Sequence, residues 1–209
     1  MSPRIHPSAM IEAGVEMGAG TAVWDHVHIR RDTRIGADCI IGEKTYIAYG
    51  VEIGHRVKIN AFVYICTNVT IEDGVMISAG TIFTNDRFPR ATTPDLRQLR
   101  SSEPDAHTLP TRICQGATIG AGCVIGNDLE IGRFAMVGMG SVVTKSLPAF
   151  HLALGHPAVS VGSVCRCGQM LTQFAAAPAA ASVEVTCAAC GLLYAVGVDR
   201  SVVELRPPA

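Results

Sequence analysis

A period of six residues dominates the sequence from Ile5 to Phe83. The residue four places after each repeat start is, with few exceptions, small or β-branched. An α-helix cannot keep a period of six on one face, and a plain amphipathic strand alternates every two residues. Two inward residues per repeat indicate short strands joined by corners, which stack into a parallel β-helix. The large apolar repeat positions are Ile5, Ile11, Met17, Val23, Ile29, Ile35, Ile41, Ile47, Ile53, Ile59, Ile65, Ile71, Ile77 and Phe83.

The repeat is interrupted once. Residues 84–112 are polar, rich in proline and aperiodic, and loops of this length inside a compact domain are usually functional or disordered. The period resumes in the same frame at Ile113 and ends at Pro148. We therefore predict an all-β fold in which a β-helix domain occupies residues 1–162 and extrudes the loop 84–112 from one corner. Residues 148–162 have no period, so we expect them to cap the last coil.

Residues 163–209 carry two cysteine pairs. Cys165 and Cys167 flank one residue, Cys187 and Cys190 flank two, and a glycine follows each pair. Two such knuckles are what a zinc ribbon requires, and a bound metal supplies folding energy that a small apolar core lacks. We predict a C-terminal zinc-ribbon-like module with structural Zn²⁺ on these four thiolates. The alternative is four unrelated thiols.

Composition limits the partners and the location. The formal net charge of −1 gives no global field that would favour nucleic acid or an anionic membrane. The apolar run 174–181 is too short to span a bilayer, and the N-terminus lacks the apolar core of a signal peptide. We expect a cytoplasmic protein with no membrane or nucleic-acid partner. In that compartment the eight cysteines favour metal binding over disulfides, while Cys39 and Cys123 sit at inward repeat positions as small core residues.

The hexads resemble those of the left-handed β-helix acyltransferases, and this resemblance implies the hand of the coil. Residues 83–90 (FTNDRFPR) resemble the FTND-x-x-PR segment of nucleotide-sugar 3-N-acetyltransferases. Residues 137–145 (VGMGSVVTK) and 155–158 (GHPA) resemble their VGAGAVVTK and GNPA segments. Residues 5–7 and 23–30 look like the opening of UDP-2-acetamido-3-amino-2,3-dideoxyglucuronate N-acetyltransferases, some of which carry a terminal cysteine-rich module. The resemblance covers about residues 4–170.

The resemblance implies a homotrimer with its active sites between neighbouring coils and acetyl-CoA along the C-terminal coils. Backbone near Gly138, Gly140 and Ser141 would hold the pantetheine arm, and Lys145 would approach the CoA phosphates as a point charge. His156 stands where the family pattern has Asn. The cofactor-binding candidates are Gly120, Gly138, Gly140, Ser141, Lys145, His156, Pro157 and Ala158.

Acetyl transfer to a sugar amine requires a neutral nucleophile close to the thioester and an acceptor for a proton. Asn85 and Asp86 begin the long loop, where Asp86 would orient the amine and Asn85 would hold it. Alternatively, this pair only turns the chain out of the coil. His28 is the candidate histidine base and His26 a neighbouring substrate-binding candidate, whereas the resemblance implies that the departing thiolate takes the proton.

Arg30 and Arg31 are candidates for anion recognition, because a guanidinium matches a carboxylate or a pyrophosphate bidentately. We hypothesise that Arg30 reads a uronate carboxylate or the nucleotide diphosphate; a solvated surface pair is the alternative. Arg87 and Arg90 add two loop candidates for substrate binding. These features predict an acetyl-CoA-dependent N-acetyltransferase acting on a nucleotide-linked 3-amino sugar, with a UDP-3-amino-uronate favoured, in surface polysaccharide biosynthesis. The alternatives are another hexapeptide O- or N-acyltransferase and a non-catalytic scaffold with a docking module.

Overall fold

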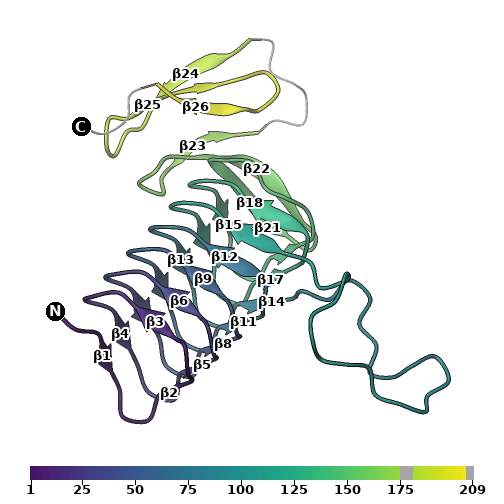
Figure 1. The fold of residues 1–209 in the computed structure, drawn as a ribbon. Helices are drawn as coiled ribbons and strands as arrows, with labels where there is room; N and C mark the ends of the chain where they lie inside the picture. The colour runs from purple at the N-terminus through teal and green to yellow at the C-terminus, as the bar shows by residue number, and fades with distance from the viewer. Residues whose placement is uncertain (175–180, 206–209) are drawn as a thin grey trace.

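The computed structural model describes residues 1–174 and 181–205, and these residues form strands, turns and loops without a helix. Each hexad supplies a strand of two or three residues and a corner, so the chain winds as a triangular coil (Figure 1). Strands on the same face pair in parallel with a spacing of 18 residues, as Ile41 does with Ile59, except where the loop intervenes, as between Ile77 and Ile119. The all-β parallel β-helix predicted from the period is confirmed.

The coil has three faces, which we call the first, second and third faces in chain order. The first face consists of β1 (Arg4–Ile5), β4 (Ala22–Val23), β7 (Ile40–Ile41), β10 (Lys58–Ile59), β13 (Met76–Ile77), β16 (Thr118–Ile119) and β19 (Met136–Val137). The second consists of β2 (Met10–Ile11), β5 (His28–Ile29), β8 (Tyr46–Ile47), β11 (Tyr64–Ile65), β14 (Ile82–Phe83), β17 (Val124–Ile125) and β20 (Val142–Val143). The third consists of β3 (Glu16–Met17), β6 (Arg34–Ile35), β9 (Glu52–Ile53), β12 (Val69–Ile71), β15 (Thr111–Ile113) and β18 (Leu129–Ile131).

The core is the inward row of the hexads. From Val23 onward these side chains are almost completely buried, and Cys39 and Cys123 are core residues as predicted. Buried threonine hydroxyls in the second inward row donate to corner carbonyls, as Thr33 Oγ1 does to the oxygen of Ala48 at 2.9 Å, so these polar groups are satisfied. Among residues 1–174 and 181–205, no strand pairs with the outer edge of β1, where Ile5 is 42% exposed. The apolar ladder is therefore closed at its C-terminal end and open at its N-terminal end.

Some corners allow no side chain. A Cβ atom added at Gly120 would lie 2.5 Å from the backbone nitrogen of Met139 in the next coil. The backbones of successive coils approach too closely there for any residue but glycine, which explains why glycine recurs directly after inward isoleucines.

The coil ends in an antiparallel cap. β21 (His151–Gly155) continues the first face in parallel with β19, and β22 (Ala158–Val164) and β23 (Met170–Gln173) extend the same sheet in antiparallel order. The predicted boundary between residues 162 and 163 falls inside β22. The loop is two residues shorter than predicted, because Thr111 and Arg112 already pair with Val69 and Thr70 in the third face.

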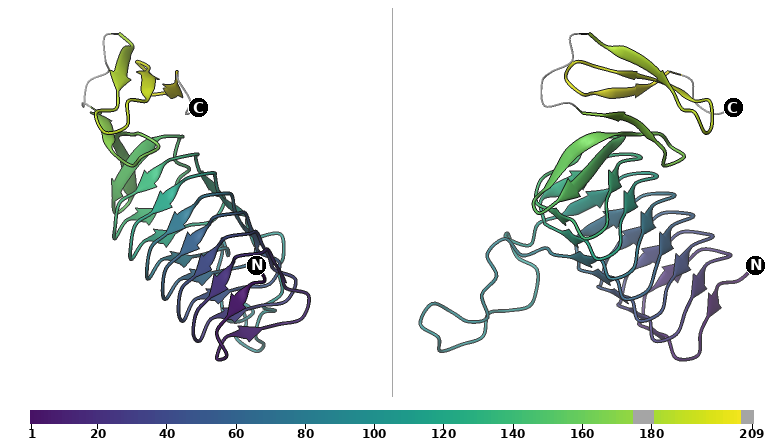
Figure 2. Two further views of the ribbon diagram at one scale, coloured as in Figure 1. Left: turned by 90° about the vertical axis from the view of Figure 1, so that its left-hand side faces the viewer. Right: turned by 180° about the vertical axis from the view of Figure 1, so that it is seen from behind.

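A small antiparallel sheet lies beyond the cap (Figures 1 and 2). It consists of β24 (Val183–Thr186), β25 (Leu193–Val196) and β26 (Val202–Glu204). Tyr194 and Phe150 pack edge to face at 5.5 Å and form a second core with Cys165 and Cys187. His151 of the cap is 5% exposed and bridges the two parts, because its Nε2 contacts the carbonyl oxygen of Arg200 at 2.9 Å and its Nδ1 contacts Ser160 Oγ at 2.9 Å.

Candidate functional site

Most of the predicted catalytic, substrate-binding and cofactor-binding residues border one face of the coil. His28 lies on the second face. His26, Gly120, Gly138 and Gly140 lie at the corner between the first and second faces, which we call the first corner. The second corner, between the second and third faces, carries Arg30, Arg31, Asn85, Asp86 and Lys145. Residues far apart in the sequence thus share a single face and its two edges.

The second face carries aromatic and apolar residues on its outer side. Its outward residues follow the parallel register in one column, which contains Met10, His28, Tyr46, Tyr64 and Ile82. Tyr46 and Tyr64 stack with ring centroids 5.2 Å apart, and His28 meets Tyr46 edge to face at 5.4 Å. Tyr64 and Ile82 remain 46% and 45% exposed. The third face differs, since its outward column is polar and contains Glu16, Arg34, Glu52, Thr70, Arg112 and Glu130.

Glu12 organises the N-terminal end of the site. Its Oε1 lies 2.6 Å from Arg30 Nε and 2.9 Å from His28 Nε2, and its Oε2 accepts from the backbone N–H of Arg31 at 3.0 Å. The Arg30 guanidinium, with the weaker help of His28, lowers the pKa of Glu12 to about 2. Arg30 also donates to the hydroxyl of Tyr46 at 2.9 Å. Arg30 therefore has its charge balanced within the chain.

Arg31 is the freer guanidinium. It lies over the ring of Tyr49 at 4.7 Å, its side chain is 49% exposed, and its carboxylate neighbour, Asp32, is 3.9 Å away. A stacked, exposed guanidinium keeps its fork available for a planar anion. Between the two adjacent arginines, the geometry favours Arg31 over Arg30 for anion recognition.

Asn85 and Asp86 form the neck of the loop, which leaves the second corner and extends away from the coil (Figure 2). Asp86 Oδ1 accepts from the backbone N–H of Phe88 at 2.9 Å, which is the local turn contact expected if this pair redirects the chain. The Asn85 amide donates to the oxygen of Thr67 at 3.3 Å, and the Asn85 carbonyl accepts from Leu109 N–H at 2.8 Å. The turn role is thus visible, and a role toward substrate would be additional.

A small hollow of about 110 Å³ lies beside this neck and is lined by Asn85, Asp86 and Arg100 among others. The two remaining loop candidates do not line this hollow and have other contacts. Arg87 lies 4.0 Å from Asp128, and Arg90 donates to the carbonyl of Pro89 at 2.9 Å.

The cofactor candidates other than Lys145 lie toward the C-terminal end of the first corner. Ser141 is 1% exposed and its Oγ accepts from the N–H of Gly155 at 3.2 Å, so its side chain is engaged within the chain. The imidazole of His156 contacts the carbonyl oxygen of Gly140, which brings the turn of residues 155–158 onto this corner. Lys145 is exposed at the second corner.

The four predicted metal ligands, Cys165, Cys167, Cys187 and Cys190, come together. One sulfur from each lies within 4.8 Å of the others. The first pair comes from the turn between β22 and β23, and the second from the turn between β24 and β25. Backbone N–H groups of Ala189 and Cys190 lower the pKa of the Cys187 thiol to about 6, which favours the thiolate that a metal binds.

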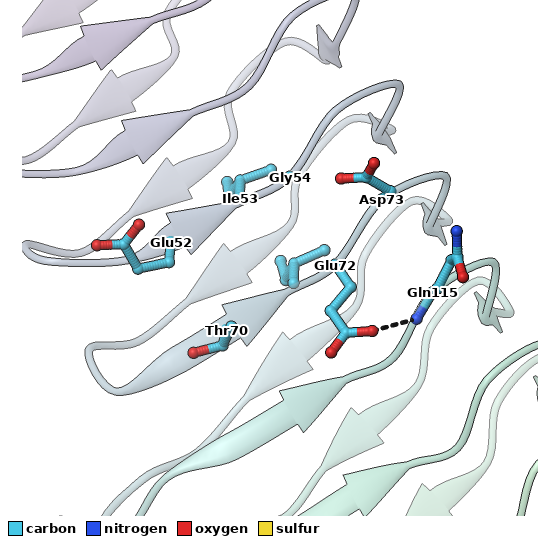
Figure 3. Close-up of a pocket in the computed structure, with 8 residues that line it drawn as sticks. Glu52, Ile53, Gly54, Thr70, Glu72, Asp73 and Gln115 are labelled. Atoms are coloured by element: carbon cyan, nitrogen blue, oxygen red, sulfur yellow. Dashed lines mark hydrogen bonds between the residues drawn. The ribbon is translucent and has the colours of Figure 1, made fainter.

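The hollow drawn in Figure 3 lies on the third face and has a volume of about 410 Å³. Its carboxylates already serve the coil. Glu72 accepts from the backbone N–H of Gln115 at 2.8 Å, and Asp73 accepts from the N–H of His55 at 2.8 Å and from Arg56 at 3.0 Å. None of the predicted site residues lines it, so we regard it as structural.

Sequence reasoning missed Glu12 and gave Trp24 no role of its own. Glu12 could have been found from the 18-residue repeat, since it stands one coil before Arg30 at the same corner. Cys66 and Cys114 are two further thiols without a predicted role. Burial raises their pKa values to about 12 and about 11, so they remain protonated.

The chain matches known hexapeptide-repeat sequences. The model of the bacterial transferase hexapeptide (six repeats) family matches residues 32–67, 50–85 and 110–145, all within the coil and the edges of its loop. These residues carry repeats of this kind, and the repeats are the coils described above.

Two curated relatives illustrate the likeness. A 61-residue segment is 49% identical to a dTDP-3-amino-3,6-dideoxy-alpha-D-galactopyranose 3-N-acetyltransferase of Aneurinibacillus thermoaerophilus, and covers 29% of this chain and 32% of the relative. The bifunctional protein GlmU of Heliobacterium modesticaldum is 28% identical over 181 residues, which cover 72% of this chain and 36% of GlmU. The matches therefore span about a third of the length of these relatives.

The solved structures show the same fold. AntD, an N-acyltransferase from Bacillus cereus crystallised with dTDP and 3-hydroxybutyryl-CoA, superposes with a TM-score of 0.53 at 21% identity, over 79% of this chain and 82% of AntD. At this identity the likeness concerns the fold. Across residues 1–174 and 181–205, no helix has the length and apolar character needed to cross a membrane.

Proposed function

We propose that this protein is an N-acetyltransferase that transfers the acetyl group of acetyl-CoA to an amino group of a nucleotide-linked sugar. The chief support is the segment 49% identical to a dTDP-3-amino-sugar 3-N-acetyltransferase. The geometry adds to it, because most of the predicted acceptor and cofactor residues border one face of the coil. AntD, whose fold is shared, binds both dTDP and an acyl-CoA.

The chemistry is a displacement at the thioester carbonyl. The neutral amine attacks, the C–N bond forms, the C–S bond breaks, and the amine loses one proton as the thiolate of CoA departs. The thiolate takes that proton in the simplest scheme. Asp86, at the loop neck, orients the amine. His28 is held by Glu12 in the way a carboxylate fixes a histidine tautomer, which keeps a second proton acceptor on the same face.

The favoured acceptor is a UDP-3-amino-uronate, and its product would enter surface polysaccharide biosynthesis in the cytoplasm. A uronate carries a carboxylate that a neutral 3-amino sugar lacks. With Arg30 balanced by Glu12, recognition of this carboxylate falls to Arg31.

The assembly we propose is a homotrimer joined through the second face. Tyr64 and Ile82 leave apolar area exposed on that face, whereas the third face is a column of charged and polar residues. Contact through the second face would place the two corners of neighbouring coils opposite each other, as a site between subunits requires. Sedimentation velocity would report this state directly.

The four-cysteine cluster fits structural Zn²⁺. A tetrahedral site with Zn–S bonds of about 2.3 Å places sulfurs about 3.8 Å apart, and the four sulfurs lie within 4.8 Å of one another. Cys165, Cys167, Cys187 and Cys190 would hold the ion, which would tie the β24–β26 sheet to the cap. The cluster lies beyond the coil, so we assign it no step of acetyl transfer.

The test is release of free CoA thiol from acetyl-CoA in the presence of UDP- and dTDP-linked 3-amino sugars, each with and without a C6 carboxylate. Turnover confined to the UDP-3-amino-uronate would support the full proposal. Turnover with a neutral dTDP-3-amino sugar would support the N-acetyltransferase activity and refute the UDP-3-amino-uronate as its acceptor. Turnover with none of these acceptors, while simple sugar hydroxyls are acetylated, would replace it by an O-acetyltransferase.

A further inference from the structure

Trp24 is an exposed aromatic ring between two hollows. It stands at the first corner, directly after β4, and is 48% exposed. A hollow of about 500 Å³ and another of about 310 Å³ share Trp24, Arg4 and Ala22 in their linings. Exposing the apolar surface of a tryptophan to water is unfavourable in free energy. A ring that lines two hollows also offers a flat surface on which a planar ligand can stack.

The larger hollow has the groups that a nucleotide requires. Arg4 and Lys58 stand in the same outward column of the first face, three strands apart, which is about 14 Å. Ala22 and Ile40 lie between them and form an apolar floor. No ion pair within residues 1–174 and 181–205 involves Arg4 or Lys58. Two cations that form no ion pair with the described residues thus flank an apolar strip beside an aromatic ring.

Two further side chains suit the remaining parts of a nucleotide. Glu43 lines the same hollow, and a carboxylate in a nucleotide site typically accepts hydrogen bonds from ribose hydroxyls. Asn60 also lines it and carries both a donor and an acceptor for the edge of a base. The Arg4 guanidinium lies 5.9 Å from the Trp24 ring centroid, which adds a cation–π contact.

We propose that this hollow binds the nucleoside diphosphate part of the acceptor, with the base stacked on Trp24 and the phosphates held by Arg4 and Lys58. The inference rests on the proposed function, since it takes the acceptor to be nucleotide-linked. Coenzyme A also contains a base and phosphates. However, the cofactor candidate Gly138 lies five strand spacings, or about 24 Å, farther along the same corner. The acceptor nucleotide is therefore the better occupant.

Trp24 is the only tryptophan in the chain, so its fluorescence reports this site alone. Titration of the wild-type protein with UDP or dTDP should quench the emission saturably, because a stacked base contacts the indole. Inorganic pyrophosphate, which lacks a base, should leave the emission nearly unchanged, and CoA should quench it only at much higher concentration. Equal quenching by CoA and UDP would assign the hollow to the cofactor and overturn the inference.

Substitutions extend the test to kinetics. Trp24→Ala should raise the KM for the nucleotide sugar at least about tenfold, as loss of one stacked base does, with the KM for acetyl-CoA unchanged. Trp24→Phe should recover most of that loss. Phe62→Ala is the matched control, because Phe62 is 57% exposed and has Lys44 5.1 Å from its ring centroid, yet lines neither hollow.

The outcomes separate this inference from the proposed function. Acetyl transfer with an unchanged nucleotide-sugar KM in Trp24→Ala would refute the nucleotide site and leave the N-acetyltransferase intact. Saturable quenching by UDP without acetylation of any amino sugar would support the nucleotide site and refute the proposed N-acetyltransferase activity. If emission instead follows protein concentration and Trp24→Ala sediments as a smaller species, Trp24 belongs to a subunit contact and the inference fails.

Discussion

Replacement of Ile77 by alanine tests the ladder that holds the coil together. Ile77 is 0% exposed and pairs in register with Ile59 on one side and Ile119 on the other. The change removes three carbon atoms, worth about 0.8 kcal/mol each, so transfer alone costs about 2.4 kcal/mol. The neighbouring isoleucines belong to paired backbones and cannot move in to fill the space.

The total cost should therefore be about 3–4 kcal/mol, within the range seen for buried isoleucine or leucine replaced by alanine. For a chain of this length that corresponds to a fall in Tm of about 6–16 °C, measured by scanning calorimetry at one protein concentration and one scan rate. Ile5→Ala is the control, because Ile5 is 42% exposed and pairs on one side only, with Val23. It should lower Tm by a few degrees at most. Equal shifts for the two variants would refute a stability that depends on stacking between coils.

Three further predictions concern the cap, the cysteine cluster and the second corner. Burial lowers the pKa of His151 in the folded chain. Near and below the ordinary histidine pKa of about 6.5, the unfolded chain therefore binds more protons than the folded one. Tm should fall as the pH drops from 7.5 to 5.5, and His151→Gln should make this fall smaller. Cys187→Ser should abolish a metal content of about one Zn²⁺ per chain measured by plasma mass spectrometry, whereas Cys66→Ala, in the coil, should retain it. Arg31→Ala should raise the KM of a uronate acceptor at least about tenfold and leave that of its neutral counterpart unchanged, since a charge-assisted bond is lost only with the former; an equal rise for both would remove Arg31 from carboxylate recognition.

The hexad period predicted the coil because each repeat position has a single environment. An isoleucine at position 77 of the sequence must face inward if those at 59 and 119 do, and the structure places all three in one register. The end of the loop was misplaced by two residues, because Thr111 and Arg112 pair with the third face although their sequence is polar. The six-residue period identifies the inward-facing residues, but it does not reveal a strand that begins at a polar residue ahead of the first inward one.

The site was less predictable for a related reason. Most candidates of the site came from resemblance to known segments, whereas the balance of charge between Glu12 and Arg30 depends on contacts one coil apart. The sequence predicted the cap only as an aperiodic segment. Its antiparallel strands and the bridge from His151 to Arg200 depend on tertiary contacts, which leave no periodic pattern in the sequence. The four cysteines could be grouped from spacing alone, because metal knuckles are local.

The neck of the long loop has a consequence for how this chain can change over time. Leu109 N–H donates to the Asn85 carbonyl at 2.8 Å, and Arg87 N–H donates to the carbonyl of His107 at 3.1 Å, so the two ends of the excursion are clipped together at the corner. Inserting one residue within a hexad would turn every later isoleucine away from the core. Inserting a residue into the loop between these hydrogen-bonded ends would leave the register of the coil unchanged. Lineages of this architecture can therefore vary the length and sequence of this loop independently of the scaffold, and experimenters can graft peptides there for the same reason.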